Sequence, residues 1–130
     1  MPGWSYCYRV WTIELAPEFV PELRALAAEI RIELLAQAQV IERFGPTAGR
    51  PRVDTLKGSK HANMKELRFD AAGGVWRVAF AFDRGRKAIL LVAGDKSGRG
   101  EAAFYRRLIS VADRRFDAHL GRLKVRRARK

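Results

Sequence analysis

Two arginines occupy neighbouring strand-like runs in the second half of the chain. Arg68 lies in the run Met64–Asp70 and Arg77 in the run Val75–Asp83, and a short glycine-containing turn separates the two runs. Across a hairpin with this turn, the two arginines could lie near each other on one face. Two adjacent cations repel each other, which makes sense where an anion is to be bound. The alternative is that each arginine pairs with a nearby acid, such as Glu66 or Asp95.

Three further side chains could join such a site. Lys96 follows the last strand-like run in the loop Gly94-Asp95-Lys96-Ser97-Gly98, where a loop can present a side chain beside a sheet. Tyr105 begins the final helix; taken alone it is a boundary or core aromatic, and beside a cationic site it could stack on a base or exchange a proton. His61, in the loop before the hairpin, could act as a general acid or base or simply be solvated. Further basic residues are candidates for RNA contact: Lys57, Lys60, Lys65 and Arg99.

Other kinds of site lack the residues they need. No His, Cys and carboxylate cluster has metal-ligand spacing, no nucleophilic triad is evident, and the loop around Lys96 lacks the phosphate-loop spacing. We therefore expect neither a metal nor a cofactor. The single cysteine, Cys7, excludes an intramolecular disulfide, and no apolar run is long enough to span a membrane. The N-terminus does not resemble a signal peptide, so we expect a cytoplasmic protein.

The charge of the chain is high and unevenly distributed. The net charge is +12; residues 1–49 contain 4 basic and 6 acidic residues, whereas residues 50–130 contain 22 basic and 8 acidic residues. Such a field attracts polyanions and gains affinity from counterion release at phosphates. This asymmetry favours contact with nucleic acid over contact with an acidic protein or an anionic membrane.

The hydrophobic pattern predicts a single α+β domain over residues 1–130. A first strand is expected over 8–14, helical spacing over 19–44 as one helix or two, a loop over 47–61, and a helix after Gly100 that ends in a frayed basic tail, 124–130. Three runs between these helices, 64–70, 75–83 and 87–93, are joined by short turns and so predict a small antiparallel, mostly meandering sheet.

Strand alternation assigns faces to these runs. Trp76, Val78, Phe80 and Phe82 form the core face of their strand, so Ala79 and Ala81 face away beside Arg77 and are expected to leave a shallow surface. The run 88–92 is apolar throughout, which predicts a strand covered on both faces.

These motifs together resemble a known family. The runs Leu56–Phe69, Val75–Phe82 and Gly94–Gly98, followed by Phe104-Tyr105, are similar in type and order to the phage-derived, HigB-like group of the RelE/ParE toxin superfamily. The similarity covers about residues 8–124. It implies a small antiparallel sheet flanked by helices, as expected above.

The resemblance implies a toxin that cleaves mRNA in the ribosomal A site without a metal, by attack of a 2′-hydroxyl on the adjacent phosphate. Arg68, Arg77, Lys96 and Tyr105 match basic and aromatic positions of that family, and the cations would stabilise charge on the phosphorane. Glu66 stands about where RelE has a lysine, and Lys65 points to the opposite face. Proton transfer is therefore open between His61, Glu66 and Tyr105. The resemblance also implies a cognate HigA-like antitoxin with a helix-turn-helix domain.

Two other functions fit the same sequence. A ParE-like protein on this fold would inhibit DNA gyrase and would not need the cluster of Arg68, Arg77 and Lys96. A basic RNA-binding module without catalysis would use the same cations for binding alone.

Overall fold

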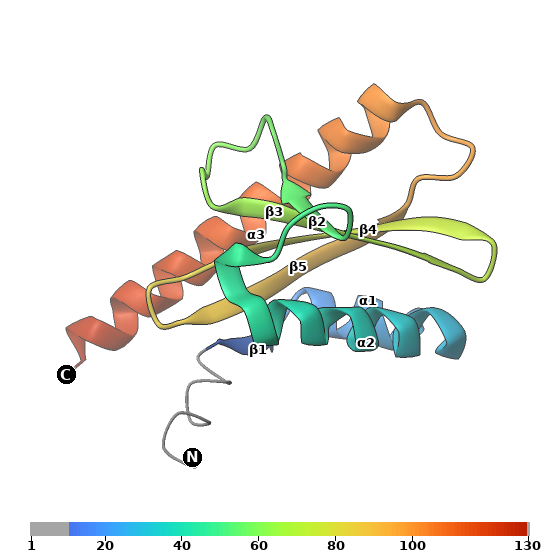
Figure 1. The fold of residues 1–130 in the computed structure, drawn as a ribbon. Helices are drawn as coiled ribbons and strands as arrows, with labels where there is room; N and C mark the ends of the chain where they lie inside the picture. The colour runs from blue at the N-terminus through green and yellow to red at the C-terminus, as the bar shows by residue number, and fades with distance from the viewer. Residues whose placement is uncertain (1–10, 130) are drawn as a thin grey trace, which may run out of the picture.

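The computed structural model describes residues 11–129. Its elements follow the chain as β1 (Thr12–Leu15), α1 (Phe19–Ala25), α2 (Ala28–Phe44), the short 3-10 helix η2 (Gly45–Thr47), β2 (Val53–Thr55), β3 (Met64–Ala71), β4 (Gly74–Phe82), β5 (Lys87–Asp95) and α3 (Glu101–Ala128). α1 and α2 lie on one face of the sheet and α3 lies on the other (Figure 1). The expected α+β class is confirmed.

The sheet is mixed rather than purely antiparallel. Its strand order is β1-β5-β4-β3-β2, with β1 parallel to β5 and all other neighbours antiparallel. α1 and α2 separate β1 from the rest of the sheet in sequence, so no hairpin constrains its direction. Pairing of β1 with β5 ends at Leu15 opposite Leu90. The strand expected over residues 8–14 is found at Thr12–Leu15, where it is four residues long. Residues 8–10 of the expected strand lie outside the described part of the chain.

The prediction of a loop over residues 47–61 is wrong in part. β2 lies within this segment and pairs with β3, placing Val53 opposite Leu67 and Thr55 opposite Lys65. A strand of three residues is too short for its alternation to be recognised. β2 nevertheless matters to the site, because it brings Asp54 beside Glu66 on β3.

Both faces of the sheet carry core. Ile89, Leu90 and Leu91 of β5 are fully buried, which confirms a strand covered on both faces. The expected shallow surface at Ala79 and Ala81 is wrong, because both alanines are fully buried. α3 crosses that face, and its buried side chains reach the sheet: Phe104, Leu108, Ala112 and Phe116. The alanines instead allow this helix to pack closely.

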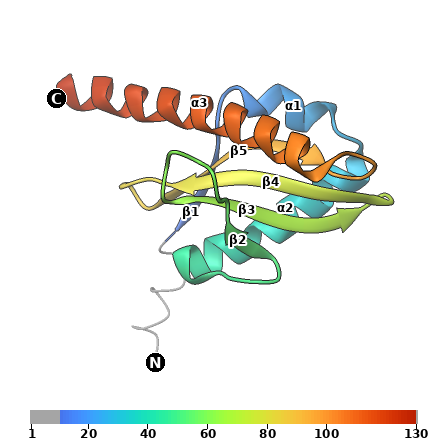
Figure 2. The same cartoon turned by 90° about the horizontal axis from the view of Figure 1, so that it is seen from above.

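The helices decide between the two alternatives for residues 19–44 and differ from the expected pattern at the C-terminal tail. The apolar pattern over 19–44 forms two helices, because Leu26 and Ala27 between them have extended backbone with ψ of 149° and 146°. The frayed tail predicted over 124–130 is wrong as far as Ala128, since α3 remains helical to that residue and extends beyond the sheet (Figure 2). Among residues 11–129, no helix is long and apolar enough to cross a membrane.

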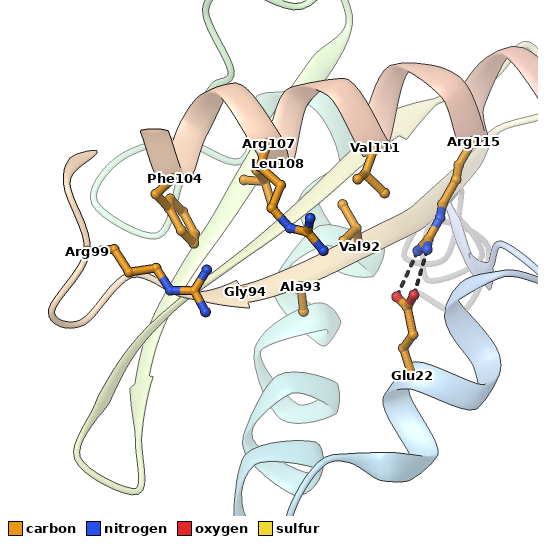
Figure 3. Close-up of a pocket in the computed structure, with 10 residues that line it drawn as sticks. All are labelled: Glu22, Val92, Ala93, Gly94, Arg99, Phe104, Arg107, Leu108, Val111 and Arg115. Carbon is orange, nitrogen blue, oxygen red and sulfur yellow. Dashed lines mark hydrogen bonds and ion pairs between the residues drawn. The ribbon is translucent and has the colours of Figure 1, made fainter. Parts of the chain in front are cut away.

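An ion pair ties α1 to α3 across the edge of the sheet. Arg115 donates from both terminal nitrogens to Glu22, at 2.8 and 2.6 Å, and also to the carbonyl of Leu91, at 2.8 Å (Figure 3). The hydrogen bond from Arg115 lowers the pKa of Glu22. This arginine thus joins α1, β5 and α3.

We expect Glu22→Gln to lower the stability of the protein at neutral pH by about 0.5–1 kcal/mol, as for a partly exposed ion pair. Because the pKa of Glu22 is lowered in the folded state, its stabilising effect is present above the ordinary glutamate range and is lost as the pH falls through the folded pKa. Urea unfolding of both proteins over a pH series measures this difference. Glu29→Gln, at an exposed position of α2, is the control; a difference that persists unchanged in acid would contradict the assignment.

Candidate active site

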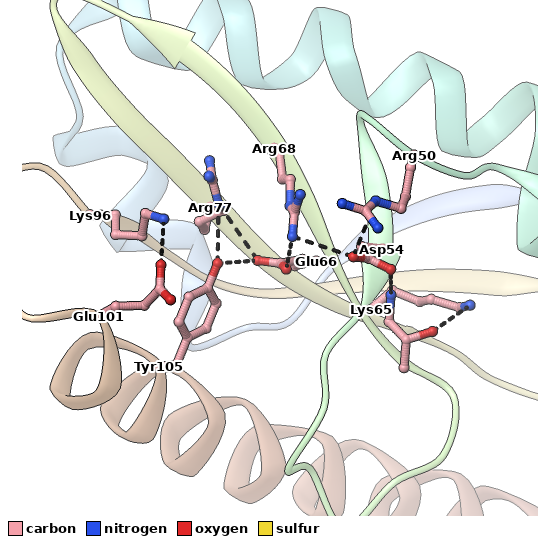
Figure 4. Close-up of polar contacts among 10 residues, drawn as sticks. Arg50, Asp54, Lys65, Glu66, Arg68, Arg77, Lys96, Glu101 and Tyr105 are labelled. Carbon is pink, nitrogen blue, oxygen red and sulfur yellow. Dashed lines mark hydrogen bonds and ion pairs between the residues drawn. The ribbon is translucent and has the colours of Figure 1, made fainter.

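A buried carboxylate lies at the centre of the polar cluster. Glu66 of β3 is only 4% exposed and projects from the sheet toward α3 (Figure 4). Its Oε1 accepts a hydrogen bond from the Tyr105 hydroxyl at 2.8 Å, and its Oε2 accepts one from Arg68 at 2.9 Å. Burial of a carboxylate is costly unless it has hydrogen-bonding and charged partners of this kind.

The two arginines meet as strand alternation predicted. Arg68 of β3 lies directly opposite Arg77 of β4 in the sheet register. Arg77 Nε donates to the Tyr105 hydroxyl at 3.2 Å and lies 3.7 Å from Glu66 Oε1. Arg68 also contacts Asp54 of β2, at 3.4 Å. The carboxylate of Glu66 therefore offsets the repulsion between the two arginines. Of the two acids that the sequence offered as partners of these arginines, Glu66 is the one that pairs with them.

Lys96 is held at the rim of the cluster by the turn after β5. Its Nζ lies 3.0 Å from Glu101 and 5.9 Å from the centre of the Tyr105 ring. Asp95 does not pair with the arginines; it accepts backbone hydrogen bonds from Val75 and Ser97, and the bond from Ser97 lowers the pKa of Asp95. Asp95 thus fixes the turn that presents Lys96.

These side chains line an open cleft of about 650 Å³ between the sheet and the first turns of α3. The cleft brings together four of the five expected catalytic residues, Arg68, Arg77, Lys96 and Tyr105, and one of the expected RNA-contacting residues, Lys57. Its acids are Asp54, Glu66 and Glu101. The cleft is therefore a set of paired charges, in which an incoming phosphate would compete with carboxylates for the cations.

The environment of Tyr105 favours its protonated form. Burial, and next the hydrogen bond to Glu66, raise the pKa of Tyr105, and the hydrogen bond from Arg77 opposes this shift only in part. At neutral pH the phenol therefore holds its proton and can donate it.

The structure does not bring the remaining expected residues to the cleft. His61 contacts Asp117 at 2.9 Å and packs edge-on against Phe116, beside the middle of α3. Lys60 pairs with the same Asp117. Lys65 reaches Thr55 at 3.5 Å, and by alternation it projects from the opposite face to Glu66. Arg99 lines a second pocket on the other side of α3.

Comparison with known proteins gives the family. The profile of the family described as phage-derived protein Gp49-like (DUF891) matches residues 21–117. The chain belongs to this Gp49-like family. Two relatives from Mycobacterium tuberculosis (strain ATCC 25618 / H37Rv), both described as candidate toxins, are HigB2, 43% identical over 103 residues, and HigB3, 41% identical over 101 residues. Each match covers 78% of this chain, and it covers 51% of HigB2 and 86% of HigB3, so the chain spans about half the length of the first relative.

A solved structure agrees with the fold. The free-state structure of a mutant of the E. coli toxin RelE superposes with a TM-score of 0.53 at 14% sequence identity, covering 77% of this chain and 94% of that one. At this identity the likeness concerns the fold alone. The family match and the HigB relatives confirm the resemblance to the HigB-like group, and the RelE structure agrees with the fold that this resemblance implied.

Two acids of the cleft, Asp54 and Glu101, were not predicted from the sequence. Asp54 lies in the strand that was expected to be a loop, and no pattern in sequence places it beside Arg68. Glu101 is the first residue of α3, where an acid is favoured by the helix dipole in any helix. Its salt bridge to Lys96, five residues earlier, depends on the geometry of the intervening turn.

We expect the tyrosine that ionises last to be Tyr105. The chain has three tyrosines, and ultraviolet absorbance during an alkaline titration follows their ionisation. Tyr105→Phe is expected to remove the latest step. Glu66→Gln is expected to lower the pKa of Tyr105 toward the ordinary tyrosine value of about 10, because the acceptor carboxylate is lost. If Tyr105→Phe instead removed an ionisation step in the ordinary tyrosine range, the contacts described for Tyr105 would be contradicted.

Proposed function

We propose that this chain is the toxin of a type II toxin–antitoxin pair and that it cleaves mRNA on the ribosome. The observation that carries this proposal is the shared contact of Arg77, Tyr105 and Glu66 within a cleft that Lys96 and Arg68 border. The names of the HigB relatives support the role of toxin. The cluster supports a phosphate-cleaving reaction over gyrase inhibition, which has no need of it.

The arrangement suits attack of a 2′-hydroxyl on the adjacent phosphate. The 2′-oxygen forms a bond to phosphorus, the bond from phosphorus to the 5′-oxygen breaks, and the products are a 2′,3′-cyclic phosphate and a free 5′-hydroxyl. Arg77 and Lys96 would stabilise the charge that develops on the phosphorane oxygens. Such stabilisation is commonly the largest contribution of an active site of this kind.

Glu66 and Tyr105 are the groups best placed for the two proton transfers. Glu66 would accept the proton of the attacking 2′-hydroxyl, and Tyr105, protonated at neutral pH, would give its proton to the leaving 5′-oxygen. Since the two groups are already joined by a 2.8 Å hydrogen bond, the proton on Glu66 can return to Tyr105 after the reaction. His61 is the weaker candidate, because its contacts lie with Asp117 and Phe116.

Attraction of RNA to the cleft would come largely from α3. Basic residues recur along this helix, and exposed members of the series include Arg106, Arg107 and Arg114. A long cationic helix steers a polyanion toward the molecule and gains affinity from released counterions. A cognate antitoxin with a helix-turn-helix domain, which we propose as the second partner, would have to mask part of this charge.

Primer extension on mRNA after brief induction tests the proposed activity. The wild type is expected to produce translation-dependent cuts, and Arg77→Ala/Lys96→Ala to reduce the cleavage rate by about a thousandfold or more, since one such group commonly supplies about a hundredfold. Arg24→Ala/Arg43→Ala removes the same charge from exposed positions of α1 and α2, on the other face of the sheet, and is the control. Intact mRNA in cells arrested by the wild type would overturn the ribonuclease and favour gyrase as the target.

A second experiment separates proton transfer from binding. In a purified ribosome assay, Glu66→Gln keeps the size of the side chain but cannot accept the proton, so kcat is expected to fall by about 100-fold or more. The apparent affinity for programmed ribosomes should change far less. A matching loss in His61→Gln, with Glu66→Gln near wild type, would assign the base to the histidine instead.

A further inference from the structure

A second pocket lies on the other side of α3 from the catalytic cleft. It has a volume of about 270 Å³ and is bounded by β5, by α3 and by Glu22 of α1 (Figure 3). Tyr105 and Ala102 of α3 line the cleft, whereas Arg107 and Val111 line this pocket. The first turns of α3 therefore separate two sites, and we call the second one the arginine groove.

Three arginines border the arginine groove: Arg99, Arg107 and Arg115. Arg115 already binds a carboxylate, that of Glu22, through two hydrogen bonds of 2.8 and 2.6 Å. Arg99 and Arg107 are exposed, and within residues 11–129 neither forms a salt bridge. Their side chains extend over the mouth of the groove (Figure 3). Among the described residues, Arg99 and Arg107 thus have no carboxylate within salt-bridge distance, whereas Arg115 has that of Glu22.

The floor of the arginine groove is apolar and includes the open edge of β5. Val92, Leu108 and Val111 supply apolar side chains. β1 pairs with β5 only as far as Leu90, so residues 92–95 have no neighbouring strand on that side among the described residues. The amide of Lys96 donates to Val75 of β4, and alternation then turns the amides of Ala93 and Asp95 toward the open edge.

We propose that the arginine groove binds an extended acidic segment of a partner protein, which adds as a strand to the open edge of β5 and places carboxylates on Arg99 and Arg107. An exposed strand edge offers main-chain hydrogen bonds to such a segment, and alternate side chains give the specificity. One face of the added strand would contact the apolar floor, and Glu22 on Arg115 shows how this surface holds a carboxylate.

The same features do not suit RNA. A nucleic-acid backbone needs cations, but it has no use for an open strand edge and gains little from a floor of valine and leucine. The groove also borders Glu22 of α1, a carboxylate that would repel a phosphate chain continuing toward that helix. A short acidic peptide can end before this residue. The proposal concerns binding only and does not depend on the ribonuclease.

Fluorescence anisotropy with the whole protein tests this binding. The probe is a labelled short peptide of alternating glutamate and valine, and the comparison probes are a glutamine–valine peptide and an oligouridine. Arg99→Ala/Arg107→Ala is expected to weaken binding of the acidic peptide by about tenfold or more, the effect of losing charge-assisted hydrogen bonds. Arg106→Ala/Arg114→Ala, with the same change in net charge, is expected to weaken it by less than about twofold. Hydrogen exchange should show new protection at the amides of Ala93 and Asp95.

Several results would overturn the proposal. Equal weakening in the two double variants would mean that net charge alone attracts the peptide. Absence of peptide binding, or binding without protection of the two amides, would exclude strand addition. Weakened binding of oligouridine but not of the peptide in Arg99→Ala/Arg107→Ala would make the groove an RNA site. Because the assay needs no catalysis, a negative result here is distinct from failure of the mRNA cleavage experiment.

Discussion

The polar cluster of this protein depends on one buried carboxylate. Glu66, 4% exposed, contacts Arg68 through one oxygen and Tyr105 through the other, and lies 3.7 Å from Arg77. Without it, two arginines directly opposite each other on neighbouring strands would repel, and the Tyr105 hydroxyl would lose its acceptor. A glutamate at this position therefore lets the sheet hold two arginines side by side.

α3 borders two pockets of the molecule, one on each side of the helix. Its inner face packs on the alanines of β4, and this close packing brings Tyr105 down to the level of Glu66 and Arg77. One flank of the helix then borders the cleft, and the other carries Arg107 and Arg115 to the edge of β5. Small side chains on the sheet are thus a condition for the site, since larger ones would lift the helix and separate the tyrosine from its partners.

The sequence allowed the class of fold, the central hairpin and the meeting of Arg68 with Arg77 to be predicted, because these follow from local alternation and short turns. It did not allow β2 or the parallel pairing of β1 to be predicted, since both depend on contacts between distant segments. The same limit explains the missed acids. Asp54 and Glu101 meet their basic partners only once β2 has paired and the turn after β5 has formed. His61, in turn, was a reasonable candidate by chemistry, but its loop lies against the middle of α3.

The end of β5 links the two sides of the molecule. Gly94 and Arg99 border the arginine groove, and Lys96, between them in sequence, borders the cleft. Asp95 fixes this turn by accepting hydrogen bonds from Val75 and Ser97. Gly94 also packs closely against α3, since an added Cβ would lie 2.9 Å from the Phe104 ring. A ligand on the edge of β5 would therefore contact the same turn that positions Lys96, so the two sides of the molecule share this segment.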